Sequence, residues 1–111
     1  MYAIPNCDTV KKARLFLDKK KIAYEFVDFK KTPPTKDLIK KWADFMGELP
    51  VNKKGTTYKK LKDDFESLTP IKKIDFMIEN SSMIKRPVLE KNGKTMAIGF
   101  DEEHYAGLKL G

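Results

Sequence analysis

The chain has 111 residues, of which 41% are apolar and 35% charged, with a formal net charge of +7 at pH 7. This composition excludes a disordered chain, and no apolar run approaches the roughly 20 residues of a membrane span. The length suits one domain, which we predict over residues 1–111. Residues 1–4 lack the features of a signal peptide, and one cysteine cannot form an internal disulfide, so we expect a cytoplasmic location without a membrane partner. The lysines are spread along the whole chain, and we therefore expect no dedicated nucleic-acid surface.

A strand, a helix and a second strand are predicted within the first thirty residues. The apolar stretch Met1 to Ile4 ends at the turn-forming pair Pro5-Asn6. The following helix starts at Asp8 or Thr9, and its apolar residues recur at helical spacing, at Val10, Ala13 and Leu17. A second β-rich run comprises Tyr24, Phe26 and Val27. This order predicts a βαβ unit with parallel strands.

The middle of the chain is predicted to be helical. One helix starts after Thr35 and ends at Gly47, with an apolar stripe of Leu38, Ile39, Trp42, Phe45 and Met46. The next follows Gly55 and faces inward with Tyr58, Leu61 and Phe65. A third starts at Thr69-Pro70, because threonine caps a helix and proline is tolerated at its first position. Its apolar face comprises Ile71, Ile74 and Ile78.

A hairpin and a short helix are predicted to close the chain. Residues 88–91 and 94–98 flank Asn92-Gly93, a pair that suits a two-residue hairpin turn. Asp101 opens the last helix as its cap. Together the elements predict an α/β protein with a mixed four-stranded sheet, flanking helices and a helical insertion, which is the thioredoxin-like arrangement.

The lone cysteine, Cys7, is the first candidate for chemistry. It lies between a strand end and a helix start, where unpaired N–H groups and the helix dipole favour a thiolate. The alternative is a buried, inert cysteine. Position 10, which would complete a redox pair, holds Val10. Any turnover at Cys7 therefore requires an external thiol, such as glutathione or a separate protein dithiol.

The pair Arg86-Pro87 opens the first hairpin strand and is the second candidate. A cis Pro87 beside the cysteine loop would let a peptide backbone pair with the strand edge, and Arg86 would offer donors to a carboxylate or oxyanion. The alternative is an ordinary strand-start proline and a solvated arginine.

Other polar residues give weaker indications. Lys11, Lys12, Lys53 and Lys54 are able to face an anion, although a solvated surface explains them better. His104 has no companion ligand nearby, so we expect it to be exposed and predict no metal site. We expect Trp42 to lie in the core.

Four separated motifs resemble the arsenate reductase (ArsC) and Spx family, and within it the YffB-like glutathione-dependent thiol reductases. These motifs are IPNCDTVKKA (residues 4–13), NKKGTTYKKL (52–61), SMIKRPVL (82–89) and IGF (98–100). The resemblance implies a thioredoxin-like fold with a helical insertion, Cys7 as nucleophile and Arg86 before a cis Pro87. Lys53 falls about where arsenate reductases carry an oxyanion-binding arginine, and Phe100 falls near another arginine of those enzymes. Both differences weaken the arsenate interpretation.

The resulting prediction is a glutathione-dependent thiol-disulfide reductase with Cys7 and Arg86 as catalytic residues. Its substrate-binding residues are Asn6, Lys11, Lys53, Arg86 and Pro87. The predicted partners are glutathione or another external thiol and a small-molecule or protein disulfide, and no bound cofactor is expected. An arsenate or other oxyanion reductase ranks second. A non-enzymatic Spx-like regulator that binds RNA polymerase ranks third, since the Cys-x-x-Cys switch usual in such regulators is absent.

Overall fold

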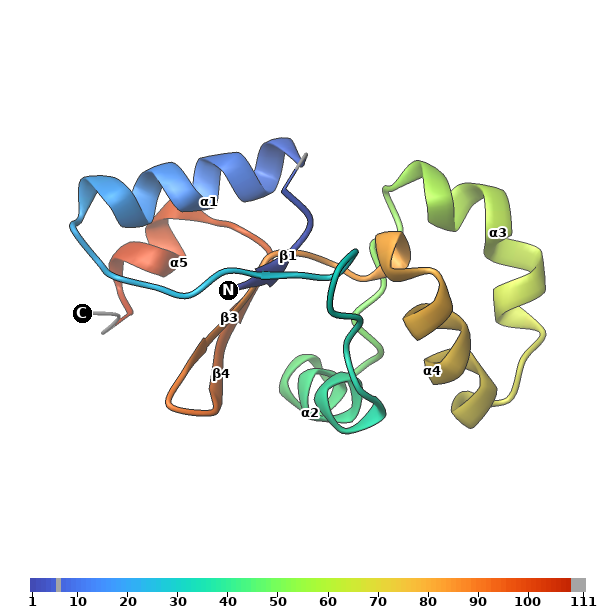
Figure 1. Ribbon diagram of the computed structural model, residues 1–111. Helices are drawn as coiled ribbons and strands as arrows, with labels where there is room; N and C mark the ends of the chain where they lie inside the picture. The colour runs from blue at the N-terminus through green and yellow to red at the C-terminus, as the bar shows by residue number, and fades with distance from the viewer. Residues whose placement is uncertain (6, 109–111) are drawn as a thin grey trace. The chain divides into compact units, whose positions relative to one another are not determined.

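The computed structural model describes residues 1–5 and 7–108 (Figure 1). These residues form two compact units. The first comprises Met1–Thr32 and the segment from Arg86 onward, and the second comprises Pro33–Lys85. The single domain over 1–111 stays a prediction.

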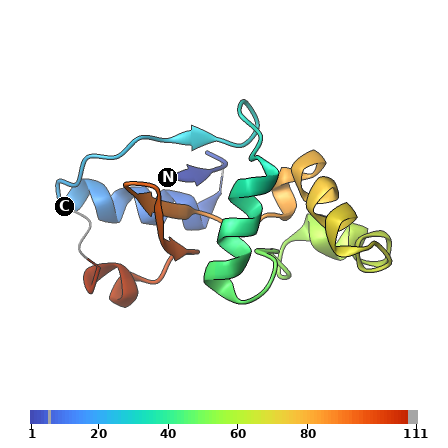
Figure 2. The same ribbon diagram turned by 90° about the horizontal axis from the view of Figure 1, so that it is seen from below.

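A mixed four-stranded sheet lies at the centre of the first unit. Its strands are β1 (Tyr2–Ala3), β2 (Val27–Asp28), β3 (Val88–Lys91) and β4 (Lys94–Ile98), in the order β2-β1-β3-β4. The first two strands are parallel, and the other two pairings are antiparallel. Figure 2 shows β1 and β2 side by side and pointing the same way. This confirms the predicted βαβ unit and the predicted sheet.

Two helices, α1 (Asp8–Lys19) and α5 (Glu102–Ala106), share one core with this sheet. The predicted apolar positions of α1, at Val10, Ala13 and Leu17, are all fully buried. The ring of Phe16 contacts the ring of Tyr105 of α5, with centroids 5.8 Å apart. The core therefore holds the start of α1 in a fixed place against the sheet.

The strand β2 is shorter than its β-rich sequence suggests. Its ladder with β1 covers only Val27 and Asp28, because β1 itself offers only Tyr2 and Ala3 as partners. Tyr24 and Phe26 lie outside the strand and pack, partly buried, against the core of the first unit. The apolar character of Tyr24 and Phe26 therefore reflects the packing of their side chains against the core, and not membership of a hydrogen-bonded strand.

The C-terminal turn and cap form as predicted. Asn92 and Gly93 both have positive φ, at 53° and 78°, as a two-residue hairpin turn of this kind requires. The Asp101 carboxylate accepts hydrogen bonds from the N–H groups of Glu103 and His104, at 3.0 and 3.3 Å.

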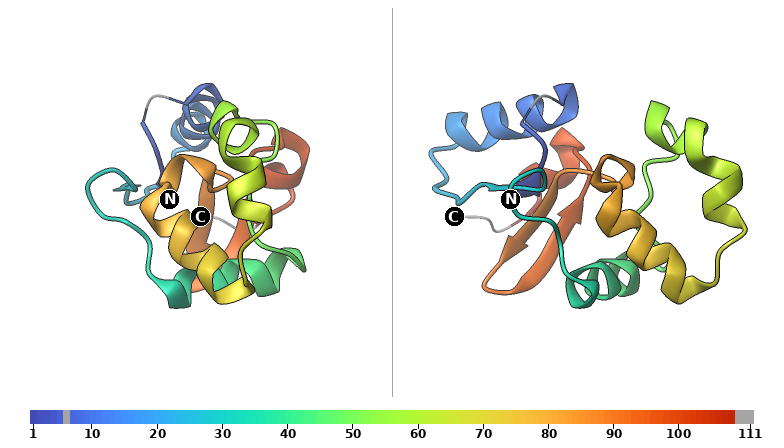
Figure 3. Two further views of the ribbon diagram at one scale, coloured as in Figure 1. Left: turned by 90° about the vertical axis from the view of Figure 1, so that its right-hand side faces the viewer. Right: turned by 45° about the vertical axis from the view of Figure 1, so that its right-hand side comes forward.

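The second unit is helical and forms the predicted insertion between β2 and β3. It contains α2 (Lys36–Met46), α3 (Thr56–Glu66), α4 (Pro70–Glu79) and a 3₁₀ turn, η1 (Ser81–Met83) (Figure 3). Thr35 and Thr69 cap α2 and α4 through their hydroxyl groups, as predicted. Gly47, at φ 81°, ends α2 in the left-handed conformation that favours glycine. Trp42 is fully buried, as expected of a core residue.

Two apolar side chains of the second unit are more exposed than predicted. Phe45 is 47% exposed, because it lies about 90° around α2 from the centre of the buried face. Ile71, in the first turn of α4, is 69% exposed, and the buried face of this helix is formed by Ile74 and Met77 instead.

Among the described residues, none of the helices has the length and apolar character that a membrane span requires.

Candidate active site

Cys7 occupies the N-cap position of α1. The chain leaves β1, turns, and reaches Cys7 in an extended conformation with φ −119° and ψ 128°. The Cys7 carbonyl accepts the first helical hydrogen bond from the N–H of Lys11, at 2.9 Å. The side chain is partly exposed, so the inert, fully buried alternative does not apply. Cys7 is therefore not enclosed in the core.

The surroundings of Cys7 favour the thiolate. Burial raises the pKa of the thiol, but this effect is outweighed by the N–H of Val10, the side chain of Arg86 and the N–H of Thr9. The net result is a pKa below the ordinary value. The thiol makes no capping hydrogen bond of the kind that Thr35 makes, yet these groups lie near enough to stabilise its anion. Because the thiolate is the nucleophilic form of a thiol, the lowered pKa favours nucleophilic chemistry at Cys7.

Arg86 reaches Cys7 because of the sheet register. β1 pairs antiparallel with β3 at Tyr2 and Val88, and continuing that register places Arg86 opposite Ile4, where the chain leaves β1 toward the cysteine. The guanidinium lowers the pKa of the Cys7 thiol by hydrogen bonding and by its charge. A positive group beside the sulfur is able to stabilise negative charge on it.

The peptide bond between Arg86 and Pro87 is cis, as the resemblance implied. Pro87 is fully buried, and its carbonyl accepts a hydrogen bond from the N–H of Gly99 at 2.8 Å. The proline is therefore fixed at the start of β3 next to the charged group at the site.

The structure brings together only some of the predicted binding residues. Lys11 lies exposed in the first turn of α1, one helical turn from Cys7. Lys53 is exposed on a turn before α3 in the second unit, and its role stays a prediction. Asn6 lies outside the described residues.

Phe100, which the resemblance places near an arginine of arsenate reductases, belongs to an aromatic cluster. Its ring contacts those of Tyr105 and Phe16, with centroids 4.8 and 6.0 Å away. Phe100 therefore packs against the same core cluster as the partly buried Cys7.

His104 is exposed, as expected. The part of the chain that the structure describes contains no group of three or more His, Cys, Asp or Glu residues able to hold a metal.

One charged residue near the site, Arg14, is absent from the sequence-based selection. It follows Cys7 by two helical turns, a spacing that places both residues on the same side of α1. That spacing alone did not distinguish Arg14 from the lysines around it.

The chain is similar in sequence and structure to several known proteins. A solved structure of the protein YffB is 38% identical, with a TM-score of 0.84, and the match covers 99% of this chain and 96% of that one. An arsenate reductase (ArsC) related protein from Brucella melitensis is 37% identical with a TM-score of 0.70, covering 98% and 92%. The global transcriptional regulator Spx of Streptococcus agalactiae is 26% identical over 93% of this chain and 77% of that protein. The ArsC family model matches residues 2–108, and the chain therefore belongs to the ArsC family.

Proposed function

We propose that the protein is a glutathione-dependent thiol-disulfide reductase that uses Cys7 as its single nucleophile. The Cys7 thiolate attacks one sulfur of a substrate disulfide. A bond forms between the two sulfurs, the substrate S–S bond breaks, and the second substrate sulfur leaves as a thiolate that takes a proton from solvent. During the exchange, negative charge moves from the attacking Cys7 sulfur to the leaving sulfur. Arg86 stabilises the part of this charge that lies near Cys7.

A second exchange restores the enzyme. The sequence holds one cysteine, so the bound substrate sulfur must be released by a thiol from outside. Glutathione, as its thiolate, attacks the mixed disulfide, forms a disulfide with the substrate sulfur and releases the Cys7 thiolate. In this proposal the glutathione backbone pairs beside Pro87, and Lys11 or Lys53 binds a carboxylate.

The observation that carries this proposal is the N-cap position of Cys7 beside Arg86, where the pKa of the thiol is lowered. A partly exposed thiol with a lowered pKa, on a fold shared with the YffB and arsenate reductase-related proteins, fits exchange chemistry. A purely structural cysteine has no need of a neighbouring arginine.

The test is turnover of a glutathione mixed disulfide on a cysteine-containing peptide, with reduced glutathione as the second substrate. We expect release of peptide thiol at a rate proportional to enzyme, and no enzyme-dependent rate with Cys7→Ser. A Cys7→Ser variant that is as active as the parent would overturn the proposal.

Arsenate reduction is the second candidate, favoured by the relatives whose names refer to arsenate reductase. A compact oxyanion requires several converging cations. Arg86 supplies one, whereas Phe100 is committed to the aromatic cluster. On one preparation, we expect arsenate turnover to be much weaker than turnover of the mixed disulfide. Efficient arsenate turnover without disulfide turnover would reverse the ranking.

A regulatory role is the third candidate, because Spx proteins are among the relatives. A module that binds RNA polymerase without chemistry would retain its function in Cys7→Ser. Binding of the polymerase by both parent and Cys7→Ser, together with absence of disulfide turnover, would favour that role.

A further inference from the structure

A hollow of about 380 Å³ lies entirely within the first unit, close to Cys7 in the sequence. Pro5, two residues before Cys7, forms part of its wall. The other lining residues come from α1 and from the segment around β2, namely Arg14, Phe26, Val27, Asp28, Lys31 and Thr32.

Arg14 is held in a fixed orientation at this hollow. Its Nε donates a hydrogen bond to the Tyr24 hydroxyl at 3.0 Å, and its guanidinium carbon lies 4.4 Å from the centroid of the Phe26 ring. These contacts leave the two terminal nitrogens for other partners, and no carboxylate among the described residues forms a salt bridge with Arg14. A partly buried guanidinium held in this way is suited to bind a planar carboxylate with two parallel hydrogen bonds.

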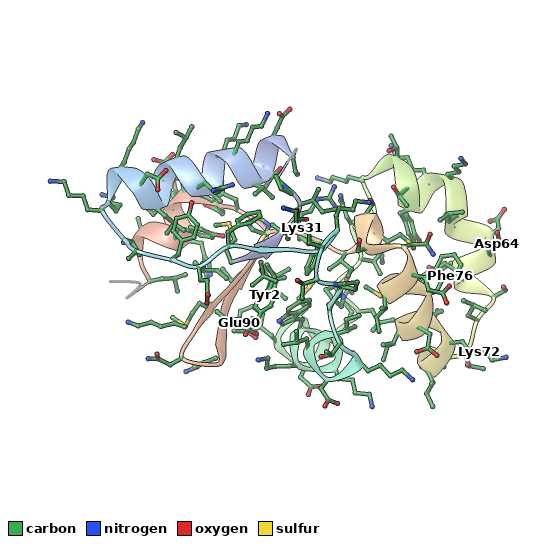
Figure 4. The ribbon with its side chains drawn as sticks, viewed as in Figure 1. Tyr2, Lys31, Asp64, Lys72, Phe76 and Glu90 are labelled. Atoms are coloured by element: carbon green, nitrogen blue, oxygen red, sulfur yellow. The ribbon has the colours of Figure 1, made fainter. Side chains whose placement is uncertain are left out.

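The other charges of the hollow leave it cationic. Lys31 lies exposed on the segment that follows β2 (Figure 4). Asp28 opposes the two cations, but one of its oxygens already accepts a hydrogen bond from the N–H of Lys30 at 2.8 Å. The hollow is therefore lined by two positive side chains, Arg14 and Lys31, and by one negative side chain, Asp28, whose carboxylate already accepts a backbone hydrogen bond.

The distance from Cys7 to this hollow matches a small peptide thiol. Arg14 lies seven positions after Cys7 along α1, a rise of about 10 Å, and long helical side chains lean back toward the start of the helix. Glutathione carries its thiol on the central residue, so a terminal carboxylate lies roughly 7 Å from the sulfur when the peptide is extended, and the backward lean of the arginine covers the remaining distance. A thiol at Cys7 and a carboxylate at Arg14 are thus within reach of one molecule that passes Pro5.

We infer that Arg14, assisted by Lys31, binds a carboxylate of glutathione while the glutathione sulfur reacts at Cys7. This inference rests on the proposed function and adds a specificity-determining residue to it. In the reaction with oxidised glutathione, the Cys7 thiolate forms a bond to one glutathione sulfur, the S–S bond breaks, and the other half leaves as a thiolate that solvent protonates. Arg14 takes no part in this exchange and acts only on the carboxylate.

The test compares two disulfides that differ in charge. Formation of the mixed disulfide at Cys7 is followed by intact mass, with oxidised glutathione or with the neutral bis(2-hydroxyethyl) disulfide. Arg14→Gln is expected to slow the reaction with oxidised glutathione about tenfold and to leave the reaction with the neutral disulfide unchanged. Lys31→Gln, at an exposed side chain, is expected to slow the glutathione reaction about two- to threefold. Lys19→Gln, which removes a charge from α1 away from the hollow, should change neither rate.

The outcomes separate this inference from the proposed function. If the parent reacts with both disulfides and Arg14→Gln slows neither, or slows both equally, Arg14 does not recognise the carboxylate and the inference fails while Cys7 chemistry stands. If Arg14→Gln fails to fold, an equal glutathione rate in Lys31→Gln and the parent overturns the inference. If the parent reacts with neither disulfide, the proposed function fails and this inference fails with it.

Discussion

Replacement of Arg86 by glutamine tests how Cys7 is activated. A hydrogen bond with one charged partner contributes about 1.5–3 kcal/mol. Because Cys7 is partly exposed, we expect Arg86→Gln to remove thiolate stabilisation near the lower value. At a pH below the Cys7 pKa of both the parent and the variant, this loss of stabilisation lowers the population of thiolate about tenfold. A thiolate of higher pKa is intrinsically more nucleophilic, with a Brønsted coefficient of about 0.4–0.5, which offsets about half of the loss. The net expectation is alkylation about three times slower at low pH.

The same reasoning predicts that the two rate profiles cross. The folded pKa of Cys7 is lowered, so the parent gains reactivity at a lower pH than a free cysteine, and Arg86→Gln moves this rise to higher pH. Above both pKa values each protein is fully thiolate, and the variant should react faster. Iodoacetamide, which is uncharged, measures both limbs when adduct formation is followed by mass spectrometry.

The adjacent Lys85 supplies a matched control for this experiment. It is exposed, and Lys85→Gln removes the same formal charge one residue away. Its profile should match that of the parent. Identical profiles for Arg86→Gln and the parent would refute the assignment of Arg86 as the activating group.

Three further predictions concern the framework of the site. Leu17→Ala, at a fully buried position of α1, should lower the free energy of unfolding by about 2–5 kcal/mol in urea titrations. Leu15→Ala, at a position that is 58% exposed, should change it by less than about 0.5 kcal/mol. Equal losses for the two variants would contradict the assignment of Leu17 to the core. Burial raises the pKa of Tyr105, because the folded protein favours the neutral phenol. The resulting contribution of Tyr105 to the free energy of unfolding is complete below about pH 10 and is lost as the pH rises further. Tyr105→Phe should therefore show a smaller alkaline loss of stability than the parent, and an unchanged loss would point to other groups. Asp101→Ala removes the cap of α5 and should cost about 1 kcal/mol by the same titration, with no loss expected if the cap is unimportant.

Local chemistry explains why several elements were predictable from the sequence. The caps at Thr35 and Asp101 depend on residues two or three positions apart, and the turn at Asn92-Gly93 depends on two neighbours. The place of Cys7 at the start of α1 follows from the change from an apolar run to helical spacing. Each of these features is decided within one helical turn or one hairpin.

Features that depend on tertiary contacts were less accessible. The length of β2 is limited by its partner β1, so the apolar Tyr24 and Phe26 do not extend the ladder. The same two side chains orient Arg14, which lies ten or more residues earlier in the chain. A sequence pattern along one helix does not contain that relation. The proximity of Arg86 and Cys7 was expected from the predicted topology, and the antiparallel register of β1 and β3 now accounts for it.

The central claim is that Cys7 exchanges with glutathione as an activated nucleophile. The most direct measurement is the intact mass of the parent protein after incubation with oxidised glutathione and again after addition of reduced glutathione. We predict one glutathione adduct on Cys7 that forms faster than on a free cysteine peptide at neutral pH, that disappears with reduced glutathione, and that is absent from Cys7→Ser. An adduct that forms no faster than on the peptide, or no adduct at all, would contradict the account.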